Sequence, residues 1–161
     1  MKPRAHAYWV VLLSFALAAF LQIVPLPTVL SWWRPPFLML VVVYWVVAIP
    51  HRVGLTTALL LGLYADVLYG AVLGQNALAL VLTTYIALLL YQRFRLFALW
   101  QQAGVVLLMV VLYQFCGQWV QSLAGRGAPD LRFLLPAITS TVLWPWLFSL
   151  LRRVRRRFKV E

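Results

Sequence analysis

Apolar residues occur along this chain in six runs, which are separated by short segments rich in proline, glycine and charged side chains. The runs cover residues 7–24, 37–49, 54–70, 74–91, 100–123 and 133–151. A helix needs about 20 residues to cross a hydrocarbon core of about 30 Å, and most of the runs approach that length. The pattern therefore predicts an all-α polytopic membrane protein, a bundle of six transmembrane helices that forms one domain over residues 1–161.

The second run is short for a membrane span. It lies between Pro35-Pro36 and Pro50, and as a helix it would be only about 20 Å long. We expect it to rely on the polar edge at Trp32, Trp33 and Arg34, on local thinning of the bilayer, or on shielding by the surrounding protein. The last run contains two prolines, which predict a kink.

Composition supports the membrane assignment. The chain is 65% hydrophobic and 11% charged, whereas a soluble domain is about half apolar and about one quarter charged. A soluble fold of this size cannot hide so much apolar surface.

The positive charge of the chain is unevenly placed. If both termini lie in the cytoplasm, eleven of the fourteen Lys and Arg residues fall on the cytoplasmic side. This bias predicts the N-in, C-in orientation. The tail at 152–161 is expected to extend the last helix, to anchor it on anionic lipids and, as a compatible alternative, to contact a cytoplasmic protein. No recognition motif points to nucleic acid. The anchoring residues are Arg152, Arg153, Arg155, Arg156, Arg157 and Lys159.

Asp66 is the only acidic residue inside an apolar run, since the other two acids are Asp130 and Glu161. A carboxylate at the centre of a membrane helix costs about 2.5–3.5 kcal/mol, so its presence calls for an explanation. It lies on a ridge of small residues with a spacing of four, which predicts that it faces a neighbouring helix. The ridge consists of Gly54, Ala58, Gly62, Asp66 and Gly70.

The segment 70–76 after Asp66 is predicted to be a tight reversal, because Gly70 and Gly74 flank it. Asp66 then either anchors this turn or faces a ligand or partner on the outer side. The alternative is a carboxylate that is satisfied by local donors and has no external partner.

A stripe of amides marks the fifth run. Gln114, Gln118 and Gln121 share one helical face. They are expected to join helices or line a shallow outer cavity, and a ligand pocket is the alternative.

Catalysis is not expected. His6 and His51 fall at the cytoplasmic edge, far from Asp66, and no second carboxylate accompanies Asp66 within the apolar runs. Cys116 is alone, so neither a disulfide nor a metal site is predicted. We therefore expect that the protein is not an enzyme and binds no cofactor.

Several ordered motifs are more specific than hydrophobicity. They are Trp33-Arg34-Pro35, Tyr44-Trp45-x-x-Ala48-x-Pro50-His51-Arg52, Asp66-x-x-x-Gly70-x-x-x-Gly74, Tyr91-Gln92-x-Phe94-Arg95-x-x-Ala98-Leu99-Trp100-Gln101-Gln102-Ala103 and Leu143-Trp144-Pro145-Trp146. Through these motifs the chain resembles the rod shape-determining protein MreD family along nearly its whole length.

The resemblance implies a multi-pass protein of the bacterial inner membrane, a non-catalytic subunit of the elongasome (Rod complex) that maintains rod cell shape. It would scaffold MreC, its most direct partner, together with RodA and its class B penicillin-binding transpeptidase and the actin-like MreB. The fold would be similar to the substrate-binding component of ECF transporters. The alternative function is a membrane module that binds a small molecule or lipid in the manner of that component. The candidate structural and partner-binding residues are Asp66, Gly70, Gly74, Arg34, Pro50, His51, Arg52, Gln114, Gln118 and Gln121.

Overall fold

The computed structural model describes residues 8–25, 27–50, 52–70, 72–125 and 134–158, and these ranges contain helices and no strand. The helices are α1 (Tyr8–Ile23), α2 (Thr28–Ser31), α3 (Phe37–Ala48), α4 (Leu55–Leu68), α5 (Gln75–Leu96), α6 (Leu99–Leu123) and α7 (Leu135–Phe158). The predicted all-α class is confirmed. The single turn α2 between the first two apolar runs was not predicted.

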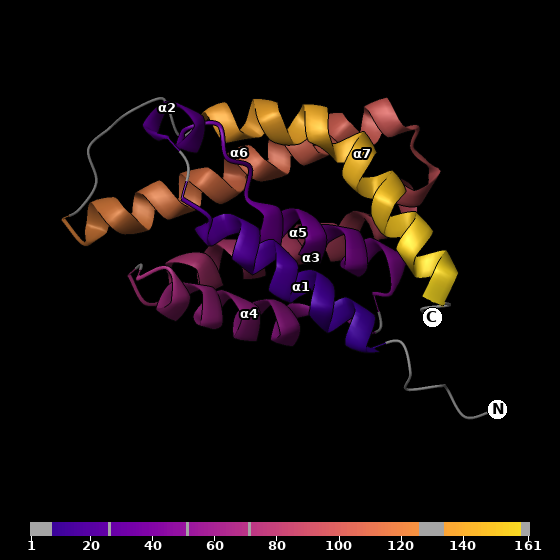
Figure 1. Ribbon diagram of the computed structural model, residues 1–161, viewed down its shortest axis with the longest axis horizontal. Coiled ribbons are helices and arrows are strands. Elements are labelled where there is room, and N and C mark those ends of the chain that lie inside the picture. The colour runs from indigo at the N-terminus through magenta and orange to yellow at the C-terminus, as the bar shows by residue number, and fades with distance from the viewer. Residues whose placement is uncertain (1–7, 26, 51, 71, 126–133, 159–161) are drawn as a thin grey trace.

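The helices form a bundle around α3 and α5 (Figure 1). α1 packs on α3, α4 packs on α5, and α6 packs between α5 and α7. α3 contributes more residues to the core than any other helix, because ten of its 12 residues are buried. Of the three explanations for so short an apolar run, the structure favours shielding by the surrounding protein.

Side chains from two other helices satisfy the ends of α3. At its N-terminus, the Phe37 amide donates to Gln22 Oε1 of α1 at 3.0 Å. At its C-terminus, Arg95 of α5 donates to the carbonyls of Val47 at 2.8 Å and Ala48 at 3.0 Å. Helix ends carry free backbone groups that are costly in an apolar medium, so these bonds allow a short helix to end inside the bundle.

The longest apolar helices are α5 and α6. Among the described residues, these two are long and apolar enough to cross a membrane by length and composition, while α1, α3 and α4 are shorter. α5 continues to Leu96, five residues beyond the end of the apolar run at residue 91. The apolar run ends there, but the next residues are good helix formers and the backbone ladder continues through them. α7 continues into the basic tail as expected, and it contains Pro145.

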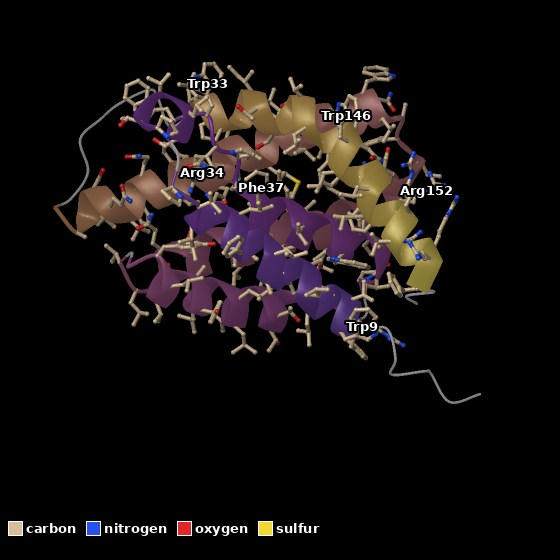
Figure 2. All side chains as sticks on the ribbon, viewed as in Figure 1. Trp9, Trp33, Arg34, Phe37, Trp146 and Arg152 are labelled. Carbon is tan, nitrogen blue, oxygen red and sulfur yellow. The ribbon has the colours of Figure 1, made fainter. Side chains whose placement is uncertain are left out.

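The described chain begins and ends at the same end of the bundle. The rings of Trp9 and Phe158 meet edge to face at 5.2 Å, and the Arg52 guanidinium lies 4.9 Å from the centre of the Tyr8 ring. We call this the basic end, because Arg52, Arg95 and the described arginines of α7 lie there. The opposite end, which carries the turn between α4 and α5, is called the Asp66 end. Figure 2 shows Trp9 and Arg152 toward the basic end and Arg34 toward the other.

Candidate functional site

Asp66 is held entirely by backbone amides. It is 1% exposed and lies in the last turn of α4. Its Oδ2 accepts from the Gly74 amide at 2.8 Å and, more weakly, from the Ala77 amide at 3.4 Å. Its Oδ1 accepts from the Asn76 amide at 2.7 Å. The first amides of a helix lack partners and carry its positive dipole end, so the carboxylate satisfies the start of α5.

The turn that Asp66 holds depends on two glycines. Gly70 has φ 64° and Gly74 has φ 96°, a left-handed backbone that a side chain with Cβ rarely adopts. The Gly70-x-x-x-Gly74 spacing therefore marks a reversal of the chain, as predicted.

The small-residue ridge brings α4 and α5 together at its middle. A Cβ atom on Gly62 would lie 2.3 Å from the Cα atom of Ala77, and Ala58 is fully buried. A Cβ atom on Gly54 or Gly70 would meet nothing within 4 Å. The predicted ridge is thus a helix contact only over its central members, because the chain has turned away at both ends.

Two adjoining hollows of about 630 and 150 Å³ lie beside the turn, and we call them together the amide cavity. They share the lining side chains Gln22, Tyr69, Gln75 and Asn76, which come from three separate segments. The Tyr113 hydroxyl donates to Asn76 Oδ1 at 2.8 Å. Gln75 Oε1 is buried and has no hydrogen-bond partner among the described residues.

The structure brings part of the glutamine stripe to this cavity. Gln114 lines the smaller hollow and Gln121 the larger, whereas Gln118 is half-buried on the same helix and lines neither. Asp66 lines neither hollow; it fixes the wall through the backbone.

Sequence reasoning missed Gln22, Tyr69 and Tyr113. Gln22 could have been found, because it is a polar residue near the end of an apolar run. Nothing in the sequence marks the two tyrosines as site residues, because aromatic residues are common in apolar helices.

The other candidates divide between the two ends. Arg34 donates to the carbonyls of Gln22 and Val24, and so closes the end of α1. Pro50 is half-buried just after α3, and Arg52 packs on Tyr8. His51 lies outside the described residues.

A second cavity, of about 340 Å³, lies at the basic end, and we call it the arginine cavity. Arg152 and Arg155 of the predicted tail line it, but Arg153, Arg156 and Arg157 do not, and Lys159 lies outside the described residues. Arg95 and Gln102 belong to a motif noted above but had been given no role. The full lining is Tyr44, Val47, Ala48, Arg95, Gln102, Phe148, Arg152 and Arg155.

Among the described residues, no group of three His, Cys, Asp or Glu side chains could hold a metal ion. The fold and its sites define an apolar helical protein with two helices of membrane-spanning length and with polar groups gathered at its two ends. A family model described as rod shape-determining protein MreD matches residues 3–154. The rod shape-determining protein MreD of Haemophilus influenzae is 35% identical over 162 residues, which cover the whole of both chains.

The chain therefore belongs to the MreD family of rod shape-determining proteins. No solved structure matches it significantly, so the likeness to ECF transporter components remains a prediction.

Proposed function

We propose that this chain is a non-catalytic subunit of the bacterial elongasome, which holds MreC and the peptidoglycan synthase in the inner membrane and so maintains rod shape. The observation that carries the proposal is the family match over residues 3–154, together with the full-length relative. RodA, its transpeptidase partner and MreB are the further partners proposed.

In the proposed arrangement the chain forms a single domain that crosses the membrane six times. Every helix except the short α2 makes one crossing. Support comes from the meeting of α1 and α7 at the basic end. An even number of crossings returns the chain to its starting side, and the basic side faces the cytoplasm.

A groove on α7 is the partner face that we propose. It has a volume of about 440 Å³ and an almost wholly apolar lining, and it contains Trp146, which is 75% exposed. Helices in membranes associate through close packing, so a groove gives a partner helix more contact than a smooth face. Its lining residues are Trp33, Ile138, Thr139, Val142, Leu143 and Trp146.

Co-purification with the MreC protein of the same organism tests this face. Val142→Trp fills the groove, whereas Leu108→Trp places the same side chain at an exposed position of α6 outside it. We expect Val142→Trp to reduce the recovered MreC about tenfold, which corresponds to about 1.4 kcal/mol of binding free energy. Leu108→Trp should recover it like the wild type. Equal recovery with both variants would remove α7 as the partner face.

The amide cavity supports a second candidate function, the binding of a small molecule or lipid. Gln75 Oε1 is a buried acceptor without a donor among the described residues, and such an atom favours a ligand that supplies an N–H or O–H group. Native mass spectrometry of the purified chain tests this function. A bound species that wild type retains and Gln75→Leu loses would support it, and identical spectra would contradict it.

A further inference from the structure

The arginine cavity gathers donors from three helices that are distant in sequence. Tyr44 comes from α3, Arg95 from the last turn of α5, and Arg152 and Arg155 from α7. The two α7 residues are three positions apart, so they lie on one helical face. The alternate tail residues Arg153 and Arg156 do not line the cavity.

Arg95 is fixed in place by the backbone of α3. Its Nε and Nη2 atoms donate to the carbonyls of Val47 and Ala48 at 2.8 and 3.0 Å, which orients its planar guanidinium. Gln102 is also fixed, because its Nε2 donates to the carbonyls of Phe94 and Phe97 and its Oε1 accepts from Trp144 Nε1. These two side chains form a preorganised wall.

The positive charge of the cavity has no carboxylate to balance it within the described part of the chain. Asp66 is the only acidic residue there, and it binds amides at the start of α5. Asn76 and Arg95 are near opposite ends of that helix, which places them about 28 Å apart along its axis. That separation is far beyond the reach of an ion pair, so Asp66 does not neutralise the arginines of the cavity.

Tyr44 adds a buried donor. The residue is 2% exposed, and its hydroxyl has no hydrogen-bond partner among the described residues. Its ring is held edge to face by Trp45 at 5.3 Å and by Phe148 at 5.4 Å. An unpaired buried hydroxyl is costly, so its presence beside the arginines calls for an acceptor.

We propose that the arginine cavity binds a phosphoryl group, carried by an anionic phospholipid headgroup or by a soluble phosphate ester. Three guanidinium groups and a phenol supply donors, and a phosphate offers several acceptor oxygens and a negative charge to match them. Leu96, which follows Arg95, is an exposed apolar residue that can contact the acyl chains of a lipid. This inference does not rest on the proposed elongasome role.

Native mass spectrometry of the full chain, released from phosphatidylcholine nanodiscs that contain phosphatidylglycerol, tests the proposal. Arg152→Gln with Arg155→Gln changes the cavity, and Arg153→Gln with Arg156→Gln is the matched control, with the same charge change on the same helix. We expect the cavity pair to lower retention of phosphatidylglycerol about tenfold, and the control pair to change it less than about twofold.

Two further arms complete the test. Tyr44→Phe keeps the ring packing and removes only the hydroxyl. We expect it to lower the retention of phosphatidylglycerol about threefold or more, while the protein elutes from a size-exclusion column at the wild-type volume. Excess inorganic phosphate that displaces the lipid assigns the site to soluble phosphates as well, and persistence of the lipid assigns it to headgroups.

Three results would overturn the proposal. The first is an equal loss of phosphatidylglycerol from both arginine pairs. The second is wild-type retention of phosphatidylglycerol by both Tyr44→Phe and the cavity pair. The third is displacement of the lipid by a hexaglutamate peptide under conditions where phosphate has no effect. The first would indicate a general surface attraction of the tail, and the last would assign the cavity to an acidic protein segment.

Discussion

At the scale of single residues, Asp66 shows how a membrane protein can keep a buried carboxylate. Its two oxygens accept from three amides at the start of α5. Hydrogen bonds to the charged form of a carboxylate offset its desolvation. The residue thus determines where α5 begins and how the turn at Gly70 and Gly74 closes.

Replacing Asp66 tests this account. Asp66→Ala leaves three amide donors without an acceptor and should lower stability by about 2–4 kcal/mol. Asp66→Asn keeps one acceptor oxygen, so its loss of stability should be smaller. Thermal unfolding in one detergent, together with rescue of rod shape in cells that lack the protein, measures both effects. Wild-type behaviour of Asp66→Ala in both assays would refute the anchoring role.

At the scale of helices, α4 and α5 approach each other closely at Gly62. Gly62 faces the backbone of Ala77 so closely that no side chain fits between them. The same contact sets the distance across which Asp66 reaches the start of α5. The small residues of α4 therefore position the carboxylate.

Gly62→Ala should force the two helices apart. We expect a loss of about 1–3 kcal/mol of stability from overpacking, visible as a lower unfolding temperature. Gly104→Ala is the matched control, because a Cβ atom at Gly104 of α6 meets nothing within 4 Å. It should be neutral, or stabilising by up to about 1 kcal/mol through helix propensity. A Gly62→Ala protein as stable as the control would show that the helices do not pack this closely.

The ends of α3 give a second prediction for an element. Arg95→Ala removes the donors from the Val47 and Ala48 carbonyls, whereas Arg93 of the same helix makes no such bond in the described structure. Arg95→Ala should cost about 1–2 kcal/mol and Arg93→Ala close to nothing. Equal unfolding temperatures for the two variants would contradict the role of Arg95 at the end of α3.

The apolar runs predicted six of the seven helices in the described ranges, because hydropathy reports removal from water. Hydropathy does not distinguish lipid from protein as the apolar surroundings, so it left open how the buried α3 is shielded. The turn at Asp66 could be predicted because glycine spacing and an isolated acid are local signals. The cavities could not be predicted, since Gln22, Gln75 and Gln121 meet only after the helices have packed.

At the scale of the whole molecule, charge is divided between the two ends. The basic end holds Arg52, Arg95 and the described arginines of α7, and the Asp66 end holds Arg34 close to the end of α1. This asymmetry supports the proposed orientation, in which the basic side faces the cytoplasm.

Neutralising the tail tests the proposed orientation. The test variant changes five arginines to Gln: Arg152, Arg153, Arg155, Arg156 and Arg157. It lowers the number of Lys and Arg residues on the proposed cytoplasmic side from eleven to six, against three on the outer side. We expect a mixed orientation or reduced membrane retention, measured with reporter fusions at both termini. Unchanged topology and protein level would show that the tail is not the anchor.

The ends of α3 also bear on the order in which the chain is assembled. Gln22 is synthesised before α3, but Arg95 is not made until two further helices have followed. Until then the Val47 and Ala48 carbonyls lack the donors that they have in the finished fold. The most buried helix therefore has its full set of end hydrogen bonds only after α5 has been made.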